Sequence, residues 1–412
     1  MTNALWSGQA HMPSVLGRQI TIERGEGSTL TGSDGARYFD ATSSLWYANI
    51  GHGREEMAEA AAAQIRRLEA YHVFGRFTND RAVELTERLA ALSPITDPKI
   101  ILGSGGSDAD DAALKLARHY WQAVGRPEKR VIVSRENAYH GLHAYGTAVA
   151  GLDFNRQGFG ESLVPDTARV SRDDPAELER QLLEIGPERI AAFITEPVIG
   201  AGGVFPPAPG YFEAVQRLCD EHDILLIVDE VITGFGRTGS MFATERYGLR
   251  PDMVTVAKGI TSGYAPLGGI FVAPRVWEPY YSRGADSATF RHGVTYSGHP
   301  TVAALALTNL DIIEREGLVS RAGELATVLE RELAPLTDHP LVTEIRSTGL
   351  MVAVQLGEAA SAVTVCDRLL DHGMIVRPLS VNALQISPPF ISEPHELTAL
   401  AASIRTVLDG SL

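Results

Sequence analysis

Cysteine is nearly absent from this chain of 412 residues. Only Cys219 and Cys366 occur, far apart, and neither belongs to a Cys-x-x-Cys pair. A metal or redox motif of that kind is therefore excluded, and a reducing compartment fits best. Positive charge is scarce as well, because 36 Lys and Arg face 51 Asp and Glu and give a formal net charge of -15. Nucleic acids and anionic membranes call for a basic face, so we expect neither as a partner.

Long apolar runs and targeting signals are also lacking. No uncharged stretch approaches the length that spans a bilayer, and the start, Met1-Thr-Asn-Ala-Leu-Trp-Ser-Gly, has no basic segment followed by an apolar one. The Gly-x-Ser-x-Gly motif of serine hydrolases occurs nowhere. Hydrophobic residues still make up 44% of the chain, which is ordinary for a globular protein. We expect a cytoplasmic protein with two or more structural units.

Between residues 99 and 272, short apolar runs alternate with segments of helical periodicity. The runs over 99–102, 130–134, 189–194, 224–228, 253–257 and 267–272 are typical of strands, and those over 107–124 and 211–221 of helices. Such alternation predicts an α/β fold with a mainly parallel sheet, helices on both faces and ligands at the carboxyl ends of the strands. After Pro300 a long Ala- and Leu-rich helix opens a second, smaller unit.

Two of the apolar runs each deliver one charged residue at their end. Met253-Val-Thr-Val-Ala is followed by Lys258, and Leu225-Leu-Ile-Val is followed by Asp229. A strand covered on both faces is apolar throughout, so a charge at its tip is a poor packing residue. An amine and a carboxylate at one sheet edge suit pyridoxal phosphate (PLP), with the lysine as its Schiff-base partner and the aspartate on its pyridine nitrogen. The alternatives are a lysine that extends to solvent and an aspartate that caps the next turn.

A glycine-rich turn, Gly103-Ser-Gly-Gly-Ser107, follows another strand and opens a helix. Its backbone N–H groups and the helix N-terminus favour a phosphate, and Ser107 is expected as the N-cap with Asp110 three residues on. The acidic side chains of residues 108, 110 and 111 must then point away from the anion. The alternative is a capped turn without a ligand. A dinucleotide fingerprint is excluded, because Asp108 stands where Gly is required.

Three further residues follow strand ends. Tyr139 offers an aromatic face for a flat ring, although a loop tyrosine packed against the domain surface is the favoured explanation when this residue is taken alone. Val231 points the same way as Asp229 if that strand continues, and Glu196 is a second charge at the sheet edge, expected in the same hydrogen-bonded set.

Two histidines, His140 and His143, lie three residues apart just after Tyr139. With no carboxylate or cysteine set expected near them, we predict no metal site and treat them as supporting polar residues.

The order and spacing of these motifs resemble the class III (ω-type) PLP-dependent aminotransferases of fold type I along nearly the whole chain. The matching runs are Asp34-Gly-Ala-Arg-Tyr-Phe-Asp40, Gly106-Ser-Asp-Ala, Tyr139-His-Gly, Glu196-Pro-Val, residues 225–239, Ala257-Lys-Gly-Ile-Thr-Ser-Gly-Tyr-Ala-Pro-Leu-Gly268 and His292-Gly-Val-Thr-Tyr-Ser-Gly-His-Pro300. The resemblance implies a fold type I transferase with a large PLP-binding domain over 56–300. A smaller α/β domain is built from both termini, 1–55 and 301–412.

The resemblance also assigns roles at the cofactor. Lys258 forms the covalent link, Asp229 pairs with the pyridine nitrogen, and Tyr139 and Val231 enclose the ring. Glu196 belongs to the same set.

The phosphate is held by Gly106 and Ser107, joined by Thr295 of the neighbouring subunit. That last assignment implies a homodimer with shared active sites, with a tetramer as the alternative.

Substrate contacts follow from the same resemblance, and we expect Tyr139 and Trp46 in the aromatic wall of the substrate pocket. Trp46 matches a position that shapes the pocket, and Arg377 matches an arginine that grips a carboxylate, which suits its guanidinium fork. Ala201 stands where the ornithine and acetylornithine branch has Glu, and this favours the amine:pyruvate-like branch. Gly105 and Asp108 depart from the Ser and Glu that the family often has in the phosphate turn, and Ile199 replaces a common Gln.

The expected activity is transfer of an amino group from a primary amine or ω-amino acid to a keto acid, with pyruvate preferred, through pyridoxamine phosphate. The alternatives are an aminomutase, decarboxylase or racemase on the same scaffold, and a PLP-binding regulator without turnover.

Overall fold

The structure, a computed structural model, describes residues 4–160, 163–282 and 287–412. Its larger part surrounds a seven-stranded sheet in the order β4-β10-β9-β8-β7-β5-β6. The strands are β4 (Lys99–Gly103), β5 (Val131–Arg135), β6 (Thr167–Val170), β7 (Ile190–Thr195), β8 (Leu225–Asp229), β9 (Met253–Val256) and β10 (Gly268–Val272). The mainly parallel sheet expected from the alternating pattern is confirmed.

Strand β10 runs against its neighbours, because it pairs antiparallel with both β4 and β9. The chain between β9 and β10 spans only residues 257–267 and holds a single 3-10 turn, η3 (Lys258–Ile260). A parallel crossover needs a dozen or more residues, so this connection returns the chain in the opposite direction. Strand β6 was absent from the sequence prediction, since its short run Thr167–Val170 carries an arginine and is partly exposed.

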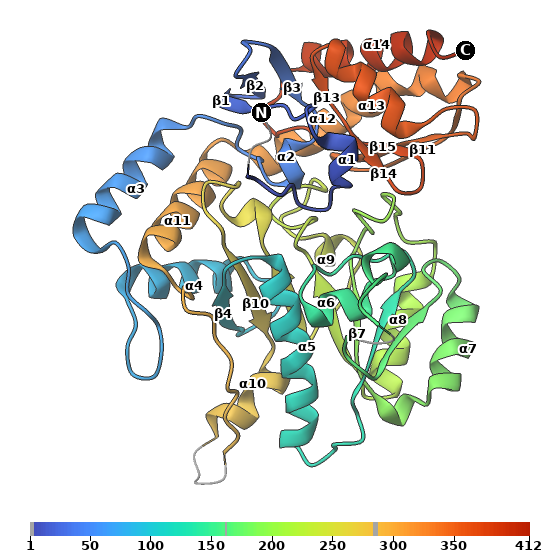
Figure 1. Cartoon of the computed structure of the whole chain (residues 1–412). Helices are drawn as coiled ribbons and strands as arrows, with labels where there is room; N and C mark the ends of the chain where they lie inside the picture. Colours follow the sequence, from blue (N-terminus) through green and yellow to red (C-terminus); the bar gives the residue numbers. More distant parts are fainter. Residues whose placement is uncertain (1–3, 161–162, 283–286) are drawn as a thin grey trace.

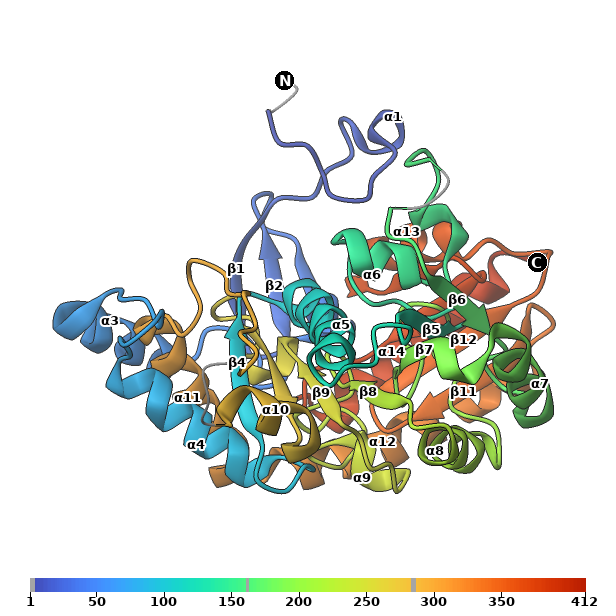
Figure 2. The same ribbon diagram turned by 90° about the horizontal axis from the view of Figure 1, so that it is seen from below.

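The central strands are buried on both faces, and their side chains alternate between two cores. Leu226 and Val228 of β8 pack into one core, and Leu225 and Ile227 into the other. Helix α8 (Tyr211–Glu221) supplies the first core, and helix α5 (Gly106–Ala123) the second. Figure 2 shows these helices on opposite sides of the sheet. The alternation explains why the strands read as continuous apolar runs.

Both ends of the chain meet in a smaller α/β layer, drawn at the top of Figure 1. Strands β1 (Ile22–Glu26), β2 (Thr29–Gly32) and β3 (Arg37–Asp40) are antiparallel, and β13 (Met374–Ile375) adds parallel to β3. A second sheet, in the order β11-β12-β15-β14, is formed by β11 (Val342–Thr348), β12 (Met351–Leu356), β15 (Ala383–Ile386) and β14 (Arg377–Leu379). Helices α12 (Leu318–Leu333), α13 (Ala362–Asp371) and α14 (Pro394–Asp409) complete this layer.

Three further long helices form a group beside β4. Helix α11 (Pro300–Arg315) packs against α3 (Glu55–Leu68) and α4 (Asp80–Leu92), whereas α7 (Pro175–Ile185) flanks α8. The domain boundaries near residues 55 and 300 stay predictions. Within the described ranges, no helix has the length and apolar character that crossing a bilayer requires.

Helix α7 offers a direct test of the core. Leu182 is 1% exposed and its neighbour Leu183 is 53% exposed. We expect Leu182→Ala to lower the free energy of unfolding by about 2–5 kcal/mol, because it leaves a cavity. The matched control Leu183→Ala should change it by less than about 0.5 kcal/mol. Urea denaturation followed by circular dichroism measures both, and equal effects would contradict the packing described here.

Candidate active site

A cavity of about 510 Å³ opens at the carboxyl ends of the central strands. This volume is typical of a small-molecule site. Seven of the eight residues predicted to contact the cofactor line it, namely Gly106, Ser107, Tyr139, Glu196, Asp229, Val231 and Lys258. The eighth, Thr295, is exposed and does not line this cavity.

Lys258 follows β9 directly and has a left-handed backbone conformation with φ of 48°. Such a conformation is uncommon for lysine and persists where the surrounding structure imposes it. The next residue must be small, because a Cβ on Gly259 would lie 2.6 Å from Nδ2 of Asn49. Burial lowers the pKa of the Lys258 amine, and the nearby carboxylates of Asp229 and Asp110 oppose this shift only in part.

The chain contains only four lysines. Lys99 lies over the ring of Trp277, and Nζ of Lys115 contacts His292. Lys129 is buried and donates to three backbone carbonyls. In the part of the chain that the structure describes, Nζ of Lys258 has no hydrogen-bond acceptor. Its amine is thus available for a covalent partner in the cavity.

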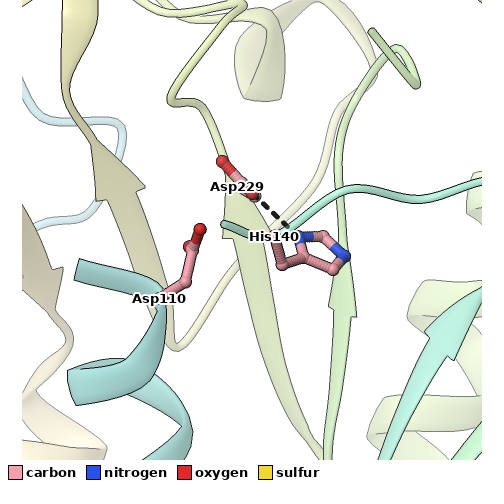
Figure 3. Close-up of side chains that lie close together, drawn as sticks. All are labelled: Asp110, His140 and Asp229. Carbon is pink, nitrogen blue, oxygen red and sulfur yellow. Dashed lines mark hydrogen bonds and ion pairs between the residues drawn. The ribbon is translucent and has the colours of Figure 1, made fainter. Parts of the chain in front are cut away.

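Asp229 ends β8 and is 3% exposed. Its Oδ1 accepts a hydrogen bond from the Val231 amide at 2.9 Å, and its Oδ2 accepts one from Nδ1 of His140 at 2.8 Å (Figure 3). Two donors stabilise the ionised carboxylate. The expectation that Val231 continues the strand is wrong, because β8 ends at Asp229 and Val231 reaches the same cavity from the following turn.

The histidines have carboxylate partners, contrary to the sequence expectation. His140 is fully buried against Asp229, and Nδ1 of His143 lies 3.5 Å from Oδ1 of Asp108. Local sequence gave no sign of these contacts, because Asp229 lies 89 positions from His140.

The N-terminus of α5 forms a cradle suited to an anion. The N-cap of α5 is Gly105, so the expectation of Ser107 as N-cap is wrong. The Ser107 hydroxyl instead accepts a hydrogen bond from the Leu142 amide. First-turn amides such as those of Gly106 and Ser107 have no intrahelical acceptor and favour a phosphate. The backbone is tightly packed here, since a Cβ on Gly268 would lie 2.2 Å from the Gly105 carbonyl oxygen.

Of the three acidic side chains near this turn, Asp111 bonds outside it as expected, whereas Asp108 bonds to Ser104 within the turn. Asp108 accepts from the amide and hydroxyl of Ser104, and Asp111 accepts from the Gly146 amide. Asp110 differs, because it lines the cavity near Asp229.

Glu196 joins the loops on one side of the cavity. Its buried carboxylate accepts from the amides of Tyr139 and Gly200, each at 2.9 Å. Burial raises the pKa of Glu196, and the nearby imidazole of His140 opposes that shift. Burial also raises the pKa of the Tyr139 hydroxyl. Glu196 therefore holds the loop that places the Tyr139 ring.

Of the four predicted substrate residues, Tyr139 lines the cavity, whereas the other three do not. Trp46 is 2% exposed in a cluster with Val198 and Leu379, while its neighbours Leu45 and Tyr47 line the cavity. Arg377 opens β14 and is half-buried, and Ala201 lies in the turn after Gly200. Their predicted roles stay predictions.

The cavity wall that includes Leu45 and Tyr47 is held by Asp40. This residue entered the sequence prediction only as the end of the matching run 34–40. Asp40 is fully buried and accepts from the Thr42 hydroxyl at 3.0 Å, the Ser44 amide at 2.7 Å and Nε2 of His52 at 2.9 Å. These bonds hold residues 43–46, three of which have positive φ, in a strained conformation.

Comparisons with known proteins agree with this geometry. A sequence model of the family described as aminotransferase class-III matches residues 12–408. The putrescine–pyruvate aminotransferase of Pseudomonas aeruginosa is 35% identical, over 94% of this chain and 90% of that protein. The diaminobutyrate–2-oxoglutarate transaminase of Halomonas elongata is 38% identical, over 94% of this chain and 89% of that protein.

Solved structures give the same picture. An omega transaminase from Pseudomonas jessenii in complex with PMP has a TM-score of 0.93 and 33% identity, and covers 99% of this chain and 96% of its own. A transaminase from the marine bacterium Virgibacillus has a TM-score of 0.93 and 36% identity, over 99% and 97% of the two chains.

The lowered pKa of Lys258 has a chemical consequence. A larger fraction of its amine is neutral at about pH 7.5 than for an ordinary lysine, so it should react fastest of the four with acetic anhydride in the cofactor-free protein. Lys129 is the control: burial lowers its pKa to about 8, but its enclosed position should leave it unlabelled. Mass spectrometry of the peptides measures the rates, and labelling of Lys258 no faster than of Lys99 would contradict the site electrostatics.

Proposed function

The chain belongs to the class-III aminotransferases, and from this premise we propose that it transfers an amino group from a primary amine or ω-amino acid to pyruvate. The enzyme is a PLP-dependent aminotransferase of fold type I. The observation that carries the proposal is the unpaired amine of Lys258 beside the hydrogen-bonded carboxylate of Asp229 in one cavity.

The residues of the cavity fit the parts of the cofactor. When bound, PLP supplies an electron sink for the bond that breaks at the donor carbon. Lys258 would hold it covalently, and Asp229 would pair with its pyridine nitrogen, where a carboxylate stabilises a positive ring. Tyr139 and Val231, which line the same cavity, would enclose the ring.

The phosphate contacts come from two chains. Gly106 and Ser107 donate their first-turn amides, and Thr295 comes from a second copy of the chain. The exposure of Thr295, away from the cavity of its own chain, supports a homodimer with shared sites.

Lys258 also moves the proton. With the cofactor bound, the amine of Lys258 would be the group placed to take the proton from the carbon that bears the donor nitrogen and to return it later. Burial lowers the pKa of this amine, so more of it is in the neutral form that accepts a proton. The Val231 amide and His140 hydrogen-bond to the two oxygens of Asp229 and hold its side chain in place.

Arg377 binds the carboxylate of the keto acid. Its guanidinium forms no salt bridge with any described side chain. Burial lowers the pKa of Arg377, and Tyr139 opposes that shift. A free guanidinium fork suits a carboxylate, and the small Ala201 leaves it uncommitted. The named relatives use pyruvate in one case and 2-oxoglutarate in another, so the choice of pyruvate rests on the amine:pyruvate-like features of this chain.

Lys258→Ala should abolish both turnover and the visible absorbance of the bound cofactor, because the covalent link and the base are lost together. Lys99→Ala is the control and should retain both, since its ammonium lies over Trp277 outside the site. Spectra and single-turnover assays with an amine donor measure the two properties. A Lys258→Ala enzyme with full activity would end the proposal.

Arg377→Ala should raise the KM for pyruvate about 10- to 100-fold, because a charge-assisted hydrogen bond contributes about 1.5–3 kcal/mol. The KM for a donor that lacks a carboxylate should change little. Arg368→Ala, on the exposed face of α13, is the matched control. Steady-state kinetics with several donors and with pyruvate or 2-oxoglutarate give the values, and an equal rise for both substrates would argue against this role.

A further inference from the structure

Asp110 is a buried carboxyl group that the proposed reaction does not use. It is 2% exposed, and the Thr255 hydroxyl donates to its Oδ1 at 2.7 Å. Figure 3 shows its side chain directed toward Asp229, and one oxygen or nitrogen atom from each of Asp110, His140 and Asp229 lies within 4.8 Å of the others. Among described residues Asp110 forms no salt bridge. A buried acid without a cation of its own requires an explanation.

A metal site explains this cluster poorly. Nδ1 of His140 and Oδ2 of Asp229 bond to each other, and Oδ1 of Asp110 accepts from Thr255. Each of the three side chains therefore already has a hydrogen-bond partner, which an ion would have to displace.

Two charged carboxylates this close in a buried site repel each other, so one of them holds a proton. Asp229 has two strong donors, the Val231 amide and His140, which favour its ionised form. Asp110 has only the Thr255 hydroxyl. Burial, followed by the charge of Asp229, raises the pKa of Asp110 well above its usual value. The proton thus belongs on Asp110.

We propose that Asp110 is a neutral carboxylic acid whose Oδ2–H donates to Asp229 and thereby sets the basicity of the carboxylate that faces the cofactor ring. This inference rests on the proposed role of Asp229. Thr255 occupies Oδ1, which leaves Oδ2 for the proton. Hydrogen bonding to Asp229 is part of the balance that fixes the ionisation of Asp110.

A neutral Asp110 affects both Asp229 and Lys258. With its proton, Asp110 would add a third donor to the two that already bond Asp229, and each further donor stabilises the charged form of a carboxylate. A charged Asp110 would also raise the pKa of Lys258, because the two groups interact, and would leave less of that amine in the neutral form that accepts a proton. The other ionisable groups around this position are Glu196, His140 and Tyr139.

Folding stability should depend on this proton. The folded-state pKa of Asp110 lies above the unfolded value, so the folded protein retains a proton that the unfolded chain has lost. Stability therefore falls as pH rises from the unfolded pKa towards the folded one, and levels off above it. Asp110→Asn is neutral at every pH and should remove this decline.

The direct test is infrared spectroscopy of the cofactor-free enzyme. The difference spectrum between wild type and Asp110→Asn should contain the carbonyl band of a protonated carboxyl group, which shifts in D₂O. Asp111→Asn, one position along the same helix, is the matched control and should leave that band unchanged, because Asp111 accepts from the Gly146 amide outside the pair. A difference spectrum with carboxylate bands in its place would overturn the proposal.

Urea unfolding between about pH 5 and about pH 8 gives a second readout. Wild type should lose stability with rising pH relative to Asp110→Asn, whereas Asp111→Asn should follow wild type. Parallel curves for wild type and Asp110→Asn would contradict a shared proton.

The loaded enzyme separates this inference from the proposed function. Asp110→Ala removes the donor and should shift the pH at which the visible absorbance of the bound cofactor changes, whereas Asp110→Asn keeps a donor and should shift it less. Asp229→Asn tests the role of Asp229 independently. If Asp229→Asn leaves that titration unchanged, the role of Asp229 fails even when the infrared result for Asp110 stands.

Discussion

Everything at this site depends on where two neighbouring strands end. Strands β8 and β9 are parallel and in register, with Asp229 opposite Thr255, so the carboxylate at the end of one strand lies near the amine that follows the other. Both strands are covered on both faces, and neither charge has a packing role. The sheet therefore holds an acid and a base together in a buried place where their charges act strongly.

A buried pair of this kind needs support, and the loops around the sheet supply it. His140 and the Val231 amide stabilise the charge of Asp229, and Glu196 fixes the loop that carries Tyr139. Asp110 lies beneath them from helix α5, whose first turn forms the phosphate cradle. One helix thus contributes to both ends of the proposed cofactor site.

Much of this arrangement could be predicted from local sequence, because periodicity and strand-end charges are local. The run before Lys258 and the helix over 211–221 are examples of segments that the structure reproduces. The direction of β10, the cap at Gly105 and the partner of His140 were missed. The direction of β10 could have been inferred from the short connection over residues 257–267. The partner of His140, by contrast, depends on a contact between residues far apart in the chain, which local sequence does not contain. The physiological amine donor could not be predicted from the sequence either, because donor choice depends on the shape of the cavity wall.

The central claim is that Lys258 carries the cofactor, and one measurement tests it most directly. Enzyme loaded with PLP is reduced with borohydride, digested, and its peptides are identified by mass spectrometry. The account predicts a single modified peptide, with the cofactor on Lys258, because the other three lysines contact Trp277, His292 or buried carbonyls. Modification of Lys99, Lys115 or Lys129 with Lys258 unmodified would contradict it.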